Sequence, residues 1–361
     1  MITDTNVVCF SSIDWDFIWQ GHQEIMTRLA ESGNRVLFIE NTGVRAPRIE
    51  DIPRLWQRLL NWRRSTKGFR QERERLCIYS PLILPFPYSW IARWINRSLM
   101  RRALERWMHA ARFYRPIIWT FLPTPLVLDL IHELEPEATI YHCADDFASS
   151  SPSAKRVSGS ETKLLQEADL VFVTSTRLHE RATQLNNHAH FFPGGVNFEQ
   201  FAQVRNASNQ VPADLREIGR PVVGYVGGIH QWIDLALLEA AAIRLPEVKF
   251  VLIGPCQTDV SRLSSLPNVR LLGAKSHEAV PRYVKGFDVG IVPYRSDSTY
   301  TACVSPTKLN EYLAMGVPVV STDLPEIRRF NAAYGNVVSV VHDANELVCA
   351  IRAALVESHL S

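Results

Sequence analysis

The feature that most constrains the fold of this chain is the alternation, almost from end to end, of short apolar runs with longer amphipathic ones. The apolar runs are rich in β-branched residues and mostly do not alternate with polar residues. This pattern is typical of strands buried on both faces of a parallel sheet. Repeated strand–helix units favour right-handed crossovers, so the sequence predicts the α/β class with doubly wound sheets.

The strand-like runs fall into two series, and a polar stretch containing Pro212 and Gly219 separates them. Such a stretch is typical of a linker between domains. A length of 361 residues allows two cores. We therefore expect an N-terminal Rossmann-like domain over 1–205, a linker over 206–220 and a C-terminal Rossmann-like domain over 221–361. The expected strands lie near 7–11, 35–40, 76–80, 117–121, 139–142 and 170–174, and then near 222–226, 248–253, 269–272, 289–292, 317–321 and 337–341.

The cysteines and the first residues bear on where the protein resides. The six cysteines are scattered and include no C-x-x-C pair. This argues against a zinc site or a disulfide scaffold and favours a reducing cytosol. The first residues lack the basic start and long apolar core of a signal peptide. We therefore expect a cytoplasmic protein.

Charge is distributed unevenly along the chain. The net charge is only +2, yet the segment Arg45–Arg115 carries seventeen Arg and Lys against five Asp and Glu. Such a segment can meet an anionic partner, and the alternative is a set of solvated helix faces. Because tryptophan accompanies arginine and no nucleic-acid module is recognisable, the segment Arg54–Arg115 predicts contact with an anionic membrane surface and not with nucleic acid. The arginines concerned are Arg54, Arg58, Arg63, Arg64, Arg93, Arg97, Arg101 and Arg102.

The most informative segment runs from Ser305 to Thr322 and reads SPTKLNEYLAMGVPVVST. Ser305 suits a helix N-cap, Pro306 the first helical position and Gly316 the helix end. Free N–H groups at the start of such a helix can hold a diphosphate, and Lys308 adds a positive charge there. Glu311, one turn further on, could accept hydrogen bonds from ribose hydroxyls. An ordinary capped helix before a strand is the alternative.

This segment resembles the nucleotide-sugar motif of GT-B glycosyltransferases, especially the large, mostly retaining family with the E-x7-E motif. Glu311 matches the second glutamate, which binds the ribose in that family, whereas Cys303 stands at the position of the first. The S-P-x-K string and the W-x-D ending at Asp234 are similar to its bacterial cell-envelope and polysaccharide branch. The resemblance implies two Rossmann-like domains facing a cleft, with the donor on the C-terminal domain and the acceptor on the N-terminal one.

Further donor-binding residues are expected in the loops after other strands of the second series. Ligands of doubly wound sheets bind at the carboxyl ends of strands. Gly227 and Gly228 end the first of these strands and allow close approach of the backbone, with His230 in the same loop. By resemblance, Leu272 and Gly273 would lie beside the nucleotide base. Ser305, Thr307, Lys308 and Glu311 complete the predicted donor site.

In the N-terminal half, two polar clusters follow strands. His142, Asp145 and Asp146 are candidates to accept the proton of an acceptor hydroxyl, so we predict them, with Lys308, as catalytic residues. A second cluster, which we predict on the acceptor side, holds Asp14, Asp16 and His22. Polar loops with helix-capping residues are the alternative for both clusters.

Taken with the resemblance, these segments predict a glycosyltransferase that moves a hexosyl group from a UDP- or GDP-sugar to a glycan or lipid-linked acceptor, in cell-envelope or exopolysaccharide synthesis. We expect no metal and no cofactor, because the helix start and Lys308 can stabilise the leaving diphosphate. The alternatives are a sugar-nucleotide epimerase on the same fold and a non-catalytic binding subunit. A dinucleotide dehydrogenase is disfavoured because the G-x-G-x-x-G fingerprint is absent.

Overall fold

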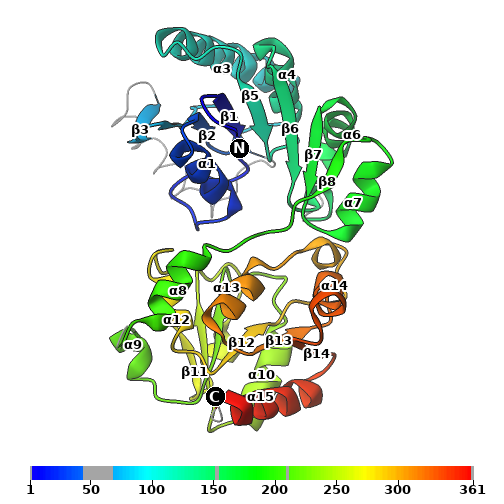
Figure 1. Cartoon of the computed structure of the whole chain (residues 1–361). Coiled ribbons are helices and arrows are strands. Elements are labelled where there is room, and N and C mark those ends of the chain that lie inside the picture. The colour runs from blue at the N-terminus through cyan, green and yellow to red at the C-terminus, as the bar shows by residue number, and fades with distance from the viewer. Residues whose placement is uncertain (1, 44–67, 151–153, 209–210, 359–361) are drawn as a thin grey trace. The chain divides into compact units, whose positions relative to one another are not determined.

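The computed structural model describes residues 2–43, 68–150, 154–208 and 211–358. It divides into two compact units, unit 1 (Met1–Phe192) and unit 2 (Pro193–Ser361), each with its own sheet (Figure 1). This division precedes the predicted domain boundary at residue 205. Helix α8 (Phe198–Asn206) packs on α13 (Thr307–Met315) and so belongs to unit 2, and α9 (Ala213–Arg216) lies within the predicted linker.

Unit 1 is an eight-stranded sheet in the order β3-β4-β2-β1-β5-β6-β7-β8. All pairs are parallel except β3 with β4, which is antiparallel. The strands are β1 (Asn6–Phe10), β2 (Arg35–Ile39), β3 (Phe69–Arg73), β4 (Leu76–Tyr79), β5 (Ile117–Thr120), β6 (Ala138–Cys143), β7 (Leu170–Val173) and β8 (Ala189–Phe191).

The helices of unit 1 follow the strands as the crossover pattern requires. Helix α3 packs along α4, and α4 along α6, while α1 lies against β2 and β4 (Figure 1). Thr124 caps α4, and a proline at the first helical position suits this start because its missing N–H would be unbonded there. The helices are α1 (Gly21–Glu31), α3 (Trp90–Ala110), α4 (Pro125–Leu134), α5 (Phe147–Ser150), the 3-10 turn η2 (Ala154–Val157), α6 (Ser158–Glu167) and α7 (Thr176–Thr183).

Unit 2 is a six-stranded parallel sheet in the order β11-β10-β9-β12-β13-β14. Helices α10 and α15 pack together, and α8, α12 and α13 form a second group (Figure 1). The strands are β9 (Val222–Val226), β10 (Lys249–Ile253), β11 (Val269–Leu271), β12 (Val289–Val292), β13 (Val319–Thr322) and β14 (Val338–Val341). The remaining helices are α10 (Leu235–Arg244), α11 (Ser261–Ser264), α12 (Val280–Val284), the 3-10 turn η3 (Thr301–Cys303), α14 (Pro325–Tyr334) and α15 (Ala344–Ser358).

The predicted α/β class with two doubly wound sheets is confirmed, and each of the twelve expected strands has a counterpart. Two short edge strands, β3 and β8, were not anticipated. Strand β3 is mostly polar and exposed, so it lacks the apolar run by which the buried strands were recognised. The strand order reverses between β1 and β5 in unit 1 and between β9 and β12 in unit 2. These switch points are where such sheets bind ligands.

Candidate functional site

Lys308 lies in the first turn of α13 and is only 8% exposed. Its Nζ donates a hydrogen bond to Oη of Tyr294 at 2.5 Å and lies 4.7 and 5.2 Å from the ring centroids of Tyr294 and Tyr225. Among the described residues, no carboxylate forms an ion pair with this ammonium. An uncompensated buried charge is costly, so this site favours an anionic ligand.

The loop after β9 brings backbone against Lys308. Gly227 has φ +143°, and a Cβ there would lie 3.2 Å from Cε of Lys308. The loop after β10 packs directly against the loop after β9, because a Cβ on Gly254 would lie 1.9 Å from the carbonyl oxygen of Gly227. Oη of Tyr225 donates to the carbonyl of Gly228 at 2.9 Å and so fixes this loop. Gly227 therefore lies beside Lys308 at the switch point of unit 2, whereas a Cβ on Gly228 would lie 3.5 Å from Cδ2 of His230.

His230 is the third predicted residue of this loop. Its ring centroid is 6.1 Å from that of Tyr294. Its Nδ1 accepts a hydrogen bond from the backbone N–H of Trp232 at 3.3 Å, which leaves the proton of the neutral ring on Nε2. Burial, and then the charge of Lys308, lower the pKa of His230 to about 4. At neutral pH it is therefore an uncharged hydrogen-bonding group.

Glu311 lies one turn into α13 and is half-buried. Burial raises the pKa of its carboxyl group, and nearby Lys308 acts in the opposite direction. Within the described part of the chain, no hydrogen bond or ion pair holds this carboxylate, so it is available to a ligand. The helix itself begins at Thr307, and Pro306 is its N-cap with no side-chain hydrogen bond. The expectation that Ser305 caps the helix was therefore wrong.

The remaining predicted donor residues lie in loops of the same unit. The backbone N–H of Leu272 bonds to the Leu252 carbonyl, and the carbonyl of Gly273 accepts from the N–H of Gly254. Gly273 follows β11 and has φ +66°. Its hydrogen bond with Gly254 connects the loop after β11 to the loop after β10. Cys303, at the position of the family's first glutamate, is buried in η3.

In unit 1, the structure joins the two predicted clusters through one aromatic ring. Phe121, which follows β5, stacks on His22 with centroids 3.8 Å apart and on His142 with centroids 4.7 Å apart. Burial and the proximity of His142 lower the pKa of His22 to about 3, and burial lowers the pKa of His142 to about 4. Both rings are thus neutral near pH 7. A base this weak suits hydrogen bonding better than proton abstraction.

The acids that follow His142 are part of an internal network. Asp146 accepts from Nη1 of Arg181 at 3.3 Å and from Oγ of Ser149 at 2.5 Å. Arg181 also pairs with buried Glu161 at 2.9 Å. The carbonyl of Asp145 faces Sγ of Cys143 at 3.8 Å. These contacts support the alternative that Asp146 holds its loop in place.

On the predicted acceptor side, Asp16 forms an ion pair with Arg70 at 2.9 Å, whereas Asp14 contributes its carbonyl oxygen to a turn with Phe17. The negative charge of Asp16 is therefore already balanced by Arg70.

The basic segment is described only in part. Arg54, Arg58, Arg63 and Arg64 lie outside the described residues. On α3, Arg93 pairs with Asp129, Arg97 with Glu133 and Arg101 with Glu105, so local carboxylates compensate much of this charge. Trp90 and Trp94 of the same helix are 77% and 66% exposed. No helix within the described ranges is long and apolar enough to cross a membrane.

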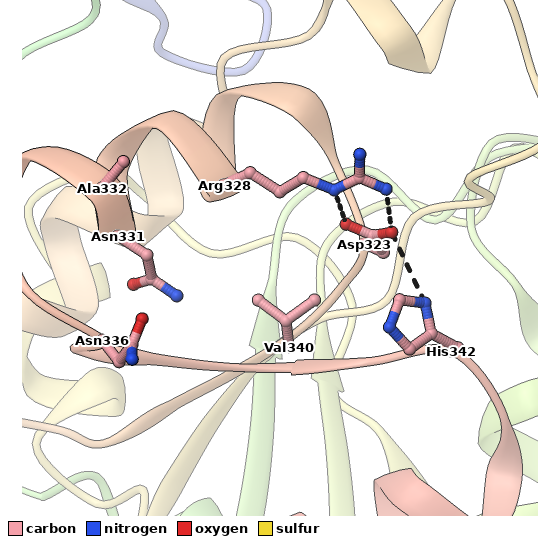
Figure 2. A pocket seen from close by; sticks show the side chains of 7 residues that line it. All are labelled: Asp323, Arg328, Asn331, Ala332, Asn336, Val340 and His342. Carbon is pink, nitrogen blue, oxygen red and sulfur yellow. Dashed lines mark hydrogen bonds and ion pairs between the residues drawn. The ribbon is translucent and has the colours of Figure 1, made fainter.

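Unit 2 also has an open pocket of about 450 Å³ outside the predicted site (Figure 2). Its polar wall is formed by Asp323, which accepts both hydrogen bonds of the Arg328 guanidinium and lies 3.4 Å from Nδ1 of His342. Because Arg328 already neutralises Asp323, we assign no ligand to this pocket. The other lining residues are Asn331, Ala332, Asn336 and Val340.

Sequence reasoning missed several residues that complete these sites. Tyr225, which lies in β9, and Tyr294, which follows β12, form the aromatic walls around Lys308, and neither was predicted as a site residue. Phe121 and Ser11 in unit 1 were missed in the same way. A polar or aromatic residue at the carboxyl end of a strand beside the switch point is the signal that could have identified them.

Comparison with known proteins agrees with this geometry. Residues 220–357 match the family model described as glycosyl transferases group 1. TuaH of Bacillus subtilis (strain 168), described as a candidate glycosyltransferase of teichuronic acid biosynthesis, is 32% identical over 238 residues. The match covers 61% of this chain and 58% of TuaH.

Solved structures agree over nearly the whole chain. Sucrose-phosphate synthase from Thermosynechococcus elongatus has a TM-score of 0.71 at 17% identity, over 98% of this chain and 90% of that one. Anabaena HepE in complex with UDP has a TM-score of 0.63 at 12% identity, over 98% and 91%. At these identities the likeness establishes the fold alone. The chain therefore has the GT-B fold, and its residues 220–357 match the family model of the group 1 glycosyl transferases.

Proposed function

We propose that this protein transfers a hexosyl group from a nucleotide-sugar to a glycan or lipid-linked acceptor in cell-envelope or exopolysaccharide synthesis. One observation carries the proposal: the ammonium of Lys308 is buried at the start of α13 and forms no ion pair within the described part of the chain. A diphosphate placed there would receive the helix N–H groups and this charge together.

The residues around Lys308 divide the work of binding the donor. Gly227 and Gly228 let the backbone approach the diphosphate, and the unpaired carboxylate of Glu311 accepts hydrogen bonds from the ribose. Ser305, Thr307 and His230 line the diphosphate and sugar, and Leu272 and Gly273 the base. In the reaction, Lys308 stabilises the negative charge that grows on the departing diphosphate. The description of TuaH supports the polysaccharide setting.

We also propose that the donor is a UDP- or GDP-sugar and that no metal or cofactor takes part. The UDP complex of HepE supports a UDP-sugar donor. The positive charge of Lys308 supports a reaction without a metal, because it can stabilise the leaving diphosphate. Calorimetry with UDP and GDP tests the donor, and transfer measured with and without EDTA tests the metal. Transfer that stops in EDTA and returns with magnesium would overturn the second proposal.

The decisive test of activity is release of nucleoside diphosphate from a panel of nucleotide-sugars, with and without lipid extract. We expect release that increases when extract supplies an acceptor. Conversion of the donor to free sugar without any acceptor would indicate the alternative epimerase. Binding of UDP or GDP without turnover of any donor would indicate a non-catalytic subunit.

We further propose a cytoplasmic protein that contacts the inner face of the plasma membrane. All six cysteines lie in the described residues and form no disulfide there, which fits a reducing compartment. Trp90 and Trp94, one turn apart on α3 and largely exposed, suit the head-group region of a bilayer. Flotation with anionic liposomes at low salt tests this. We expect wild-type protein to float and the double variant Trp90→Ala/Trp94→Ala to stay behind, whereas a wild type that never floats contradicts the proposal.

A further inference from the structure

Ser11 and His22 form a buried hydrogen-bonded pair at the switch point of unit 1. Ser11 is the first residue after β1 and is fully buried, and His22 is the second residue of α1 and 6% exposed. Oγ of Ser11 lies 3.0 Å from Nδ1 of His22. The same Oγ accepts a hydrogen bond from the backbone N–H of Ile13 at 3.1 Å.

These two contacts determine where the protons lie. The backbone N–H of Ile13 can only donate, so the Ser11 oxygen is its acceptor. The Ser11 hydroxyl proton then has one acceptor within reach among the described residues, which is Nδ1 of His22. If Nδ1 carried a proton instead, the buried hydroxyl would have no acceptor, at a real energetic cost. The neutral His22 ring therefore carries its proton on Nε2.

His22 belongs to a group of aromatic rings that also holds Phe121, His142 and Phe192. Within the described part of the chain, Nε2 has no hydrogen-bond partner and is not fully enclosed. The ring of His22 stacks on Phe121, and the ring of His142 stacks on Phe121 as well. Phe192, 41% exposed, meets His142 edge-on at 5.5 Å. Both histidines are neutral, since burial lowers the pKa of each.

This combination defines the chemistry of the ligand. Neutral imidazoles offer hydrogen bonds but no charge, and aromatic faces favour C–H groups. Neutral imidazoles offer an anion or a cation no opposite charge to offset its loss of water. A polyhydroxylated ring has both the oxygen atoms that accept from an N–H group and the C–H faces that pack on aromatic rings.

We infer that Ser11 is a positioning residue that holds His22 as an Nε2–H donor toward a neutral, hydroxyl-bearing ligand at the switch point of unit 1. The inference rests on the proposed function, in which this ligand is the sugar-class acceptor. Ser11 acts through His22 and does not itself touch the ligand.

The tautomer is tested directly by NMR of protein labelled with ¹⁵N-histidine at pH 7. The His22→Phe variant keeps a ring against Phe121 and identifies the His22 signals by their loss. We expect wild-type His22 to show a protonated Nε2 and a bare, hydrogen-bonded Nδ1. In Ser11→Ala, the Nδ1 signal should move toward that of an unbonded nitrogen and the second tautomer should become detectable. A proton on Nδ1 in the wild type, or no change in Ser11→Ala, overturns the inference.

The ligand class is tested with a panel of neutral methyl glycosides as probes. We expect at least one glycoside to shift the His22 Nε2–H signal. Its dissociation constant should rise about 5-fold in Ser11→Ala, an effect that corresponds to the loss of one hydrogen bond. Ser11→Thr, which keeps the hydroxyl, should restore affinity if it folds as judged by thermal melting. A panel that leaves the signal unmoved overturns the ligand assignment. UDP calorimetry on the same sample reports on unit 2 separately, so this failure is distinguishable from failure of the proposed function.

Discussion

In each unit a strand at which the order of the sheet reverses leads into a candidate site, at Ser11 in unit 1 and at Gly227 in unit 2, yet the electrostatics of the two sites differ. In unit 2, neither buried Lys308 nor Glu311 forms an ion pair with another described residue. In unit 1, Asp146 and Glu161 share Arg181, and the groups left over are neutral histidines. The difference shows that one topological position can be prepared for a charged ligand or for a neutral one.

Removing the buried cation should have the largest effect. We expect Lys308→Ala to lower kcat about 100-fold or more, because it would face the charge that develops on the leaving diphosphate. Lys163→Ala, which removes an exposed lysine of α6 in unit 1, is the matched control and should change kcat little. Steady-state release of nucleoside diphosphate measures both. Near-normal kcat with a reduced melting temperature would make Lys308 a structural residue and erase the contrast between the units.

Acid should destabilise the protein through its buried histidines. A histidine with a lowered folded-state pKa binds fewer protons when folded, so its contribution to stability is lost as pH falls from about 6.5 toward that lower value. The pKa in the folded state is about 3 for His22 and about 4 for His142. Each histidine should therefore lower the free energy of unfolding by about 2 kcal/mol between pH 7 and pH 5.

Urea denaturation at pH 7 and pH 5 measures this loss. The His22→Phe variant keeps a ring against Phe121 but cannot be protonated, so it should lose less stability on acidification than the wild type does. Equal acid sensitivity of the two proteins would show that His22 is not buried in its neutral form, and would remove the neutral character assigned to unit 1.

Glu311 should affect binding and stability in opposite directions. Glu311→Gln should weaken UDP binding about tenfold, since hydrogen bonds to the ribose contribute roughly 1–3 kcal/mol. Burial raises the pKa of this carboxyl group in the folded state. Ionised Glu311 therefore destabilises the free protein as the pH rises above the usual pKa of a glutamate. The variant should therefore melt at a slightly higher temperature at pH 7. Calorimetry showing unchanged affinity for UDP would remove the ribose-binding role.

The smallest effect is expected for the paired acid of unit 1. Asp146→Ala breaks a partly exposed contact with Arg181, so it should lower the free energy of unfolding by about 1 kcal/mol. Urea denaturation and kcat measured on the same preparation separate stability from turnover. A loss of kcat as large as that of Lys308→Ala, with stability unchanged, would restore the prediction that Asp146 is catalytic.

The outcome for particular residues shows how far sequence reasoning reached. Gly316 was expected to end the helix that starts near Lys308, and it does so with φ +81°, because only local backbone geometry is involved. The start of the same helix was misplaced by one residue, because Pro306, expected at the first helical position, is the N-cap. Strand β3 was missed because an exposed edge strand needs no apolar run.

The sequence by itself determined the two doubly wound sheets, since a strand buried on both faces must be apolar and its crossover helix amphipathic. It also determined which loops are candidates for binding, because the carboxyl ends of parallel strands share one edge of the sheet. Only the tertiary structure decided which candidates are paired and which are free. In the sequence, Asp146 and Lys308 are both charged residues in a loop or at a helix start. In the structure, Asp146 forms an ion pair with Arg181, which is distant in sequence, whereas Lys308 forms no ion pair with a described carboxylate. Burial likewise depends on packing between elements far apart in the chain, so the sequence could name the histidines of unit 1 but not show that they are neutral.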